Sequence, residues 1–275
     1  DGQKALVKDG EDPRVVFADW LIRPKNMFFA RTFVNRTWNW IFGLPLYESV
    51  DNLSMESKAV NPALARHLIL SFEKSGFDNR ALLREIFNSS VYQQSSLADA
   101  SDARVLAHFG TYPIRPLEAE PLIDAICQIT GTTEVYTSTT PEPYTTLPTC
   151  EDAVAIPDGS ITTAFLNLFG RSPRDSGLDA ERERGPNAGQ RMHLLNSSHI
   201  RNKLERGKYP QVTSQVEGKE SLIVHAFLRV LSRYPTKAEN ELLRQRDPKD
   251  AKKMKHGIPE IYWALINSEE FLNRH

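Results

Sequence analysis

The sequence has no apolar run of about 18 residues, so no segment of it is expected to span a bilayer. Its first residues lack a basic stretch followed by an apolar core, so we expect no signal peptide there and an interior cut through a longer chain. The 34 lysines and arginines nearly balance the 35 aspartates and glutamates, which leaves a net charge of −1. Because nucleic acids and anionic membranes attract proteins with a basic surplus, the sequence argues against both as partners.

The common signatures of catalysis and cofactor binding are also missing. The sequence has no HExxH, CxxC, GxSxG, P-loop or GxGxxG motif. It has no CxxCH either, so we expect no haem and no other cofactor in this chain. The seven histidines include no pair at i, i+4, so we expect no metal site. His193 lies near a run of charged residues in the sequence and is therefore kept as a candidate site residue.

Cysteine is scarce, with two residues in the whole chain, which is too few for a disulfide scaffold. Cys127 falls in an expected helix and Cys150 in an expected loop. We interpret them as a small buried residue and a loop thiol. A disulfide between them is the alternative, and the sequence does not test its geometry.

What the sequence does contain is a series of helix patterns. The strongest pattern covers residues 26–43, where Asn26 can cap the start of a helix and Gly43 can end it. The polar residues of this helix form only a narrow stripe, so we expect the helix to be buried on nearly all sides. Further helices are expected at 12–22, 60–76, 77–92, 115–131, 187–207, 220–235, 236–243 and 258–272.

An Asn-Ser pair recurs three times next to apolar residues, in IFNSSVY, LLNSSHI and LINSEEF. The spacing between Asn88, Asn196 and Asn267 is irregular, which favours a recurring helix end over a solenoid repeat. Because such residues favour caps, we expect a break near residues 196–198 of the helix at 187–207.

The middle of the chain has a different composition. Residues 132–160 are rich in Thr and Pro and predict a loop with a short β-hairpin between Val135–Thr139 and Tyr144–Leu147. Residues 161–170 fit a strand or a helix equally well.

The predicted fold class is therefore mainly α, an irregular multi-helix bundle with a Thr/Pro-rich central insertion. We expect one domain over residues 1–275, made of an N-terminal helical half (12–131), an insertion with a charged loop (132–186) and a C-terminal helical half (187–275).

Arg31 and Asn35 lie one turn apart on the helix expected at 26–43. A buried guanidinium without a partner is very costly, so Arg31 must meet a carboxylate or several carbonyls. We favour an internal clamp to a distant segment, and the alternative is the edge of an anion-binding pocket. The aromatic rings of this helix are spread around it, which favours core packing over a sugar-stacking platform.

Arg115, Glu118, Glu120 and Asp124 lie close together in the sequence, and Glu120 and Asp124 share a helix face. Two carboxylates can perform acid–base chemistry, as they do in glycosidases. The other interpretation, which we favour, is that acids gather at a helix N-terminus because the helix dipole attracts them.

A charged run, RSPRDSGLDAERERG, occupies residues 171–185. Lysine is as soluble as arginine, whereas arginine suits bidentate pairing with carboxylate or phosphate, so the run favours a salt-bridge network. A ligand site and a plain surface loop remain the alternatives. Its candidate residues for either a network or a site are Arg171, Arg174, Asp175, Glu181 and Arg182.

Seven blocks of the sequence, taken in order, resemble the planctomycete-type domain PSD1, or DUF1553. The most specific are RTFVNRTW at 31–38, FGRSPR at 169–174 and MHLLN at 192–196. The others lie at 61–96, 112–131, 231–239 and 263–272, so the resemblance covers nearly the whole chain.

The resemblance implies a setting but no catalytic residues. Such domains usually follow an upstream DUF1549 domain, often behind a cytochrome c-like module, in large exported proteins. It therefore implies an extracytoplasmic location, an upstream DUF1549-like partner, and haem only on an upstream domain of the parent protein. Many relatives carry CxC after the FGRxPR block, where this chain has Leu178 and Ala180, so a role for those cysteines is absent here.

We therefore expect a non-catalytic interaction or scaffold module of an exported multidomain bacterial protein, linked to extracytoplasmic redox or polysaccharide processing. The rival hypothesis is a ligand-binding or hydrolytic domain that acts on an anionic or carbohydrate substrate. It would use the charged run with Arg31, Asn35 and His193.

Overall fold

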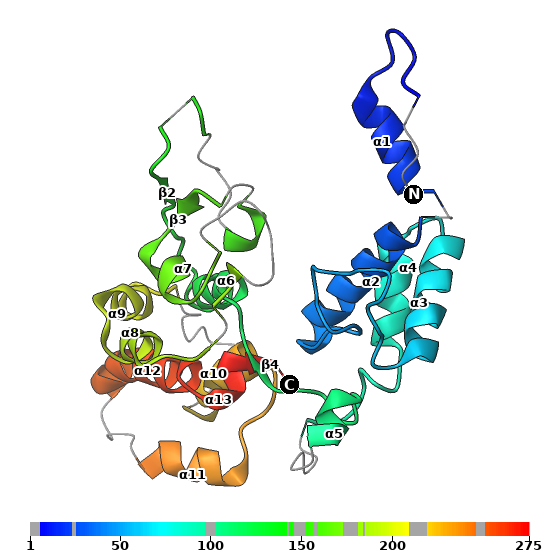
Figure 1. Ribbon diagram of the computed structural model, residues 1–275. Coiled ribbons are helices and arrows are strands. Elements are labelled where there is room, and N and C mark those ends of the chain that lie inside the picture. Colours follow the sequence, from blue (N-terminus) through cyan, green and yellow to red (C-terminus); the bar gives the residue numbers. More distant parts are fainter. Residues whose placement is uncertain are drawn as a thin grey trace. The chain divides into compact units, whose positions relative to one another are not determined.

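The computed structural model describes residues 6–23, 26–96, 103–141, 143–145, 152–156, 159–172, 181–183, 185–208, 219–245 and 251–274. The chain divides into two compact units, of which the first ends at Ile114 and the second runs from Arg115 to Arg274 (Figure 1). Helices dominate both units, which confirms the predicted mainly α class.

The first unit is built from helices, most of which begin at the expected capping residues, whereas α5 was not expected from the sequence. Its elements are α1 (Pro13–Leu21), α2 (Met27–Phe42), α3 (Pro62–Lys74), α4 (Asn79–Phe87) and α5 (Ala103–Ala107). The Asn26 side chain accepts a hydrogen bond from Phe28 N at 3.1 Å and caps α2. Gly43 ends that helix in the left-handed conformation, at φ 73°.

The core of the first unit lies between α2, α3 and α4. The ring of Trp38 lies 4.2 Å from that of Phe42 and 5.1 Å from that of Phe109, measured between centroids. Most of the aromatic stretch thus packs in the core, as the sequence favoured. The predicted burial of α2 is incomplete, however, because Phe28 and Trp40 are exposed.

The second unit holds the remaining elements. The helices are α6 (Ala119–Thr130), α7 (Ala164–Leu168), α8 (Ala188–Asn196), α9 (Ser198–Glu205), α10 (Lys219–Leu231), α11 (Lys237–Gln245), α12 (Ala251–Ile266) and α13 (Glu269–Leu272). A single 3₁₀ turn covers Ala153–Ala155. The core forms where α6 packs against α7 and α9, and where α10 packs against α12. Ile123 and Ile126 of α6 are fully buried in it.

Two short antiparallel strand pairs complete the second unit. Strand β1 (Arg115–Pro116) pairs with β4 (Asn273–Arg274), so the two ends of the unit lie together. Strand β2 (Thr137–Ser138) pairs with β3 (Ile161–Thr162). The predicted hairpin partner was therefore wrong, because β2 pairs with a strand from beyond the Thr/Pro-rich segment. Tyr144 lies in a turn and Thr145 in a bend, and Thr146 and Leu147 lie outside the described residues.

The structure defines several segments whose secondary structure or bounds the sequence left open. Residues 161–170 form both alternatives in succession, first β3 and then α7. The break expected near residues 196–198 is confirmed, since Ser197 ends α8 and its side chain caps α9. The last helix begins at Ala251 rather than near Ile258, and Ser268 starts a separate helix, α13.

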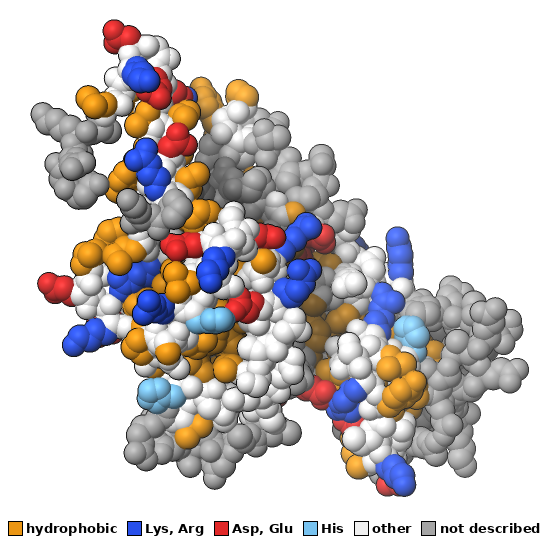
Figure 2. Space-filling view, turned by 90° about the vertical axis from the view of Figure 1, so that its right-hand side faces the viewer, with side chains coloured by type: hydrophobic (Ala, Val, Ile, Leu, Met, Phe, Trp, Pro, Cys, Tyr) orange, Lys and Arg blue, Asp and Glu red, His pale blue; other side chains and the backbone are white. Residues whose placement is uncertain are grey.

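The boundary between the units places α6 with the C-terminal elements, whereas the sequence assigned it to the N-terminal half. That the two units make one domain stays a prediction. None of the helices in the described ranges is long and apolar enough to cross a membrane. Figure 2 shows hydrophobic side chains among charged ones on the face that it presents.

Candidate functional site

Arg31 clamps the loop that follows α2 in the first unit. Its Nη1 donates to the Ser54 carbonyl at 3.0 Å and its Nη2 to the Ser57 carbonyl at 2.6 Å. The guanidinium carbon also lies 4.2 Å from the centroid of the Tyr47 ring, close enough for a cation–π contact. Arg31 thus donates to backbone carbonyls, as expected for a buried guanidinium. This is the arrangement that an internal clamp between the helix and a distant segment predicts.

Asn35 holds the same loop one turn further along α2. Its Nδ2 donates to the carbonyls of Ser49 and Val50 at 2.8 and 3.1 Å. Its Oδ1 accepts a hydrogen bond from Tyr47 N at 3.2 Å. Arg31 and Asn35 are therefore brought together, and both serve loop carbonyls and amides within the first unit.

In the second unit the charged run folds back onto the start of α6. Arg182 Nη1 and Nη2 donate to Glu120 Oε2 and Oε1 at 2.9 and 2.8 Å. Arg171 Nε lies 3.4 Å from Glu120 Oε1, and these two side chains are 8% and 9% exposed. Arg182 also reaches within 3.6 Å of Glu118 Oε2. Two carboxylates and two guanidiniums thus form one network, which we call the Glu120 network.

Burial alone would raise the pKa of Glu120, but the hydrogen bonds and charge of Arg182, with the charge of Arg171, lower it below its usual value. Glu120 is therefore an ionised acceptor at neutral pH rather than a proton donor. Arg171 also donates to the Ile161 carbonyl on β3, so its position is fixed by both the acid and the strand.

Gly170 allows the charged run to approach α7. Its φ is +84°, a conformation that L side chains rarely adopt, and its carbonyl accepts a hydrogen bond from Glu183 N at 3.1 Å. A Cβ at this position would lie 1.9 Å from the Glu183 carbonyl oxygen. Close to this contact, Ser172 Oγ donates to Glu181 Oε2 at 3.0 Å and joins the two described ends of the run.

The remaining candidate residues from the sequence include Asp124, which holds another part of the second unit. Asp124 accepts hydrogen bonds from Ala153 N and Val154 N at 2.6 and 3.0 Å, so it holds the 3₁₀ turn. Burial raises the pKa of Asp124 even though these bonds lower it. Arg174 and Asp175 lie outside the described residues, as does Cys150, whereas Cys127 is a buried free thiol.

A pocket of about 320 Å³ lies beside the Glu120 network in the second unit. Its lining combines apolar side chains with charges of both signs. The apolar lining residues include Leu117, Leu122, Phe169, Leu194 and Leu272, and the charged ones are Arg115, Glu118, Arg182, Glu183, Arg191, Glu269 and Arg274. The volume falls within the range of about 300–1,000 Å³ that is usual for small-molecule sites.

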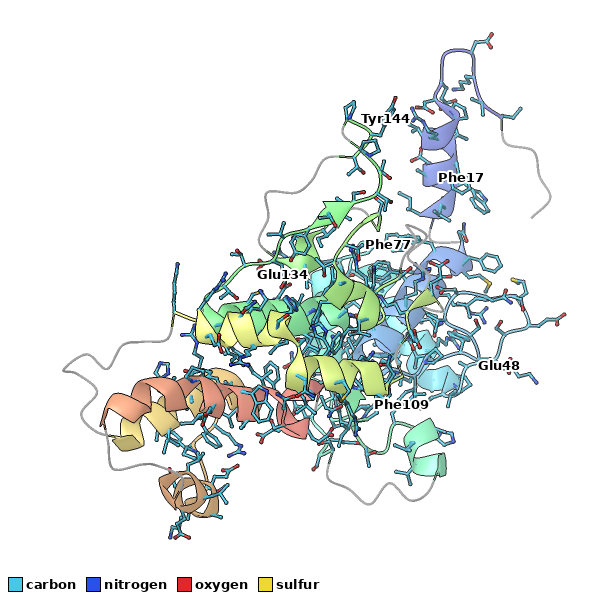
Figure 3. The ribbon with its side chains drawn as sticks, turned by 90° about the vertical axis from the view of Figure 1, so that its left-hand side faces the viewer. Phe17, Glu48, Phe77, Phe109, Glu134 and Tyr144 are labelled. Carbon is cyan, nitrogen blue, oxygen red and sulfur yellow. The ribbon has the colours of Figure 1, made fainter. Side chains whose placement is uncertain are left out.

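A second buried polar network joins α6, α8, α9 and the segment after α6. Lys203 Nζ lies 2.8 Å from Glu134 Oε1, and the two side chains are 7% and 9% exposed. His199 Nε2 lies 2.6 Å from the same oxygen, and His199 Nδ1 lies 3.2 Å from His193 Nε2. Figure 3 labels Glu134, which reaches this network from the loop before β2. We call this set the Glu134 network.

Lys203 extends the Glu134 network into the core. Its Nζ also donates to Cys127 Sγ at 3.2 Å and to the Thr133 carbonyl at 2.9 Å. Burial raises the pKa of the Cys127 thiol despite the nearby lysine charge, so the sulfur stays protonated and is a poor nucleophile. Burial would also raise the pKa of Glu134, but the bonds from His199 and Lys203 lower it overall.

The Glu134 network can hold a loop on two helices and can pass a proton between imidazoles. Burial, and then the charge of His199, lower the pKa of His193, so His193 is neutral near pH 7. Within the described ranges, no group of three His, Cys, Asp or Glu side chains is arranged to hold a metal ion.

The sequence pointed to His193 but missed its partners. The signal that was available is the position of Lys203 on α9, between Ile200 and Leu204 on the buried side of that helix. A lysine in an apolar stripe requires a buried acid. No sequence pattern, however, indicates that Glu134 is this acid, because it lies in a segment without regular secondary structure.

Comparison with protein families matches residues 13–246 to PSD1, described as a protein of unknown function (DUF1553). No curated protein and no solved structure matches the chain. The match includes both networks and runs from α1 to the end of α11.

Proposed function

This chain belongs to the PSD1 (DUF1553) family, and we propose that it is a non-catalytic interaction module that docks a neighbouring domain. The observation that carries this proposal is an apolar surface around α1. No residue of this helix is buried, although it contains Val15, Phe17 and Trp20. Phe17 is 59% exposed and projects from α1 (Figure 3).

Large exposed apolar side chains are concentrated around this helix. They include, in the first unit, Leu6, Val7, Val15, Phe17, Trp20, Ile22, Met27 and Phe28. The rings of Phe17 and Trp20 contact each other at 5.8 Å between centroids, so part of this surface is contiguous. Contiguous exposed apolar surface marks protein-binding sites in soluble proteins.

The site chemistry also supports a non-catalytic role. Glu120 is held ionised by Arg182, and Asp124 accepts from two backbone amides. Arg31 is occupied by loop carbonyls. The groups that the sequence offered for acid–base or anion chemistry are therefore engaged in holding the fold.

The proposed partner is a DUF1549-like domain upstream in the same parent protein. The proposed extracytoplasmic location, the link to redox or polysaccharide processing, and any haem upstream rest on the family resemblance. The α1 surface supports the docking itself, because exposed aromatic side chains such as Phe17 and Trp20 are typical of interface centres.

The test is a titration of this chain with a separately purified DUF1549-type domain from the same parent protein. Isothermal calorimetry should detect binding by the wild-type chain, and the double variant Phe17→Ser/Trp20→Ser should weaken it at least tenfold. Its thermal midpoint should stay unchanged because α1 buries no residue.

The matched control is Tyr234→Ser/Leu242→Ser, which removes two exposed apolar side chains from the second unit. It should bind like the wild type. Absence of binding by the wild-type chain, or equal binding by the α1 variant, would contradict the docking proposal.

A second candidate function is supported by the 320 Å³ pocket, where the Arg191 guanidinium forms no ion pair with a described residue. A small carboxylate with an apolar tail suits this guanidinium and the apolar side chains of the lining. Titration with hexanoate should then give saturable binding that Arg191→Ala weakens about tenfold and Arg206→Ala leaves unchanged. Equal weak binding by all three proteins would remove this candidate.

A further inference from the structure

A second hollow in the C-terminal unit lies between α8, α9 and α12. These helices lie side by side in Figure 1, with α9 in contact with both α8 and α12. The groove has a volume of about 770 Å³ and is shared by apolar and polar side chains. Leu194, Leu204 and Pro259 are among its apolar lining residues.

Trp263 of α12 lines the groove and is 38% exposed. Its Nε1 donates to the Leu195 carbonyl at 3.3 Å, across the groove-forming helices. This bond satisfies the single donor of the indole and fixes the ring edge. What the exposed part of the side chain offers to a ligand is therefore aromatic carbon rather than a hydrogen-bond donor.

Planar polar groups line the groove together with this indole. Glu260, also on α12, is exposed and forms no ion pair or side-chain hydrogen bond with a described residue. The Asn196 amide donates weakly to the Met192 sulfur at 3.9 Å, which leaves its oxygen for another partner. Arg201 pairs with Glu205 at 2.7 Å, with both side chains more than half exposed. The groove thus offers a carboxylate, an amide and a guanidinium next to aromatic carbon.

These groups discriminate between classes of ligand. The ionisable lining residues are Arg201, Glu205 and Glu260, whose charges sum to −1, so a polyanion gains no attraction there. A partner helix that packs its apolar face into the groove would bury the Glu260 carboxylate and the Asn196 amide without partners. Burying such groups unpaired weakens binding, and the charged one weakens it more. A sugar has apolar C–H faces for the indole and hydroxyls for the polar groups.

We propose that the groove binds a neutral oligosaccharide. One sugar ring packs on Trp263, and its hydroxyls donate to Glu260 and to the Asn196 oxygen while Arg201 donates to ring or hydroxyl oxygens. The site lies wholly within the second unit, so this proposal goes beyond the docking role and does not depend on the α1 surface.

The experiment uses the full chain and neutral hexasaccharides of four kinds, with β-linked glucose, N-acetylglucosamine, xylose or mannose units. Isothermal calorimetry and tryptophan fluorescence should show saturable binding of at least one of them. Trp263→Ala should weaken that binding at least tenfold and Glu260→Gln about threefold. Trp40→Ala is the matched control, because Trp40 is also an exposed tryptophan, at 49%, but lies in the other unit, and it should leave the affinity unchanged.

A second variant separates binding from folding. Trp263→Phe keeps an aromatic ring but lacks the Nε1 donor. Its affinity for the sugar should stay within about threefold of the wild-type value, even if its thermal midpoint falls. Raising NaCl from 50 to 500 mM should leave the affinity unchanged, since the proposed ligand carries no charge.

Failure of all four sugars to bind would overturn the proposal, as would equal binding by wild type and Trp263→Ala. Preferential binding of a sulfated heparin hexasaccharide would also overturn it, because the groove would then be an anion site. These outcomes leave the α1 docking result untouched, so the two proposals fail separately.

Discussion

Arg182 forms a bidentate ion pair with Glu120 across a sequence separation of 62 residues. The pair links the far end of the charged run to the first turn of α6, with Arg171 3.4 Å from the same carboxylate. Among its described residues, the charged run therefore acts as a connector within the second unit.

Removal of Arg182 should destabilise the second unit. Arg182→Met leaves the buried Glu120 carboxylate with Arg171 alone, and breaking a buried pair in this way costs about 3 kcal/mol or more. Urea unfolding measures the loss. Arg201→Met is the control, because its exposed pair with Glu205 should contribute less than about 1 kcal/mol. Equal effects of the two variants would argue against the network.

The Glu134 network should show strong coupling between its two buried charges. Lys203→Met leaves the buried Glu134 carboxylate with His199 alone, and Glu134→Gln leaves Lys203 buried without its anion. Each single variant should lose about 3 kcal/mol or more, whereas the double variant should lose less than the sum. A double-mutant cycle of unfolding free energies measures the coupling, and additive losses would show that the two charges act independently.

His193 should make stability depend on pH near neutrality. Its pKa in the folded protein lies below the ordinary value of 6.5, so the unfolded chain binds more protons between the two values. The resulting stability is present above about pH 6.5 and is lost as the pH falls through the folded pKa. His193→Gln should therefore flatten the fall in thermal midpoint between pH 7 and pH 5. His108→Gln, an exposed control, should leave the slope as it is.

Gly170 should tolerate no side chain. Gly170→Ala combines a left-handed backbone with a Cβ that meets the Glu183 carbonyl oxygen, and we expect a loss well above the roughly 1–2 kcal/mol of the conformation alone. Gly76→Ala measures the cost of the left-handed backbone alone, since Gly76 has φ +72° and open space around its Cβ position. Calorimetric unfolding of both variants gives the comparison, and similar losses would contradict the close approach seen at Gly170.

The sequence predicted the helices well because their ends carry local signals. The Asn-Ser pairs were interpreted as helix ends, and Asn88 follows α4, Asn196 ends α8 and Ser268 caps α13. The helices expected at 77–92 and 258–272 nevertheless ran through two of these pairs, so their bounds were wrong there. The clamp role of Arg31 was also predicted, because a buried guanidinium restricts what its partners can be. Its partners themselves, Ser54 and Ser57, carry no pattern that points to them.

Long-range pairings were the part that sequence reasoning missed. The β2–β3 pairing joins a strand inside the Thr/Pro-rich segment to one just beyond its end, and a two-residue strand is too short for alternation to mark it. Arg182 was a candidate and so was Glu120, yet nothing in their spacing placed them in contact. Glu134 and Lys203 were missed as a pair for the same reason, as their contact depends on how α9 packs against α6.

The register of β1 with β4 has a consequence for engineering. Arg115 stands opposite Arg274, so the chain enters and leaves the second unit on neighbouring strands, which are about 4.8 Å apart. A short linker can therefore join these ends, and new termini can be opened in a surface turn elsewhere. The second unit is on these grounds suited to circular permutation and to insertion as a cassette into a loop of another protein.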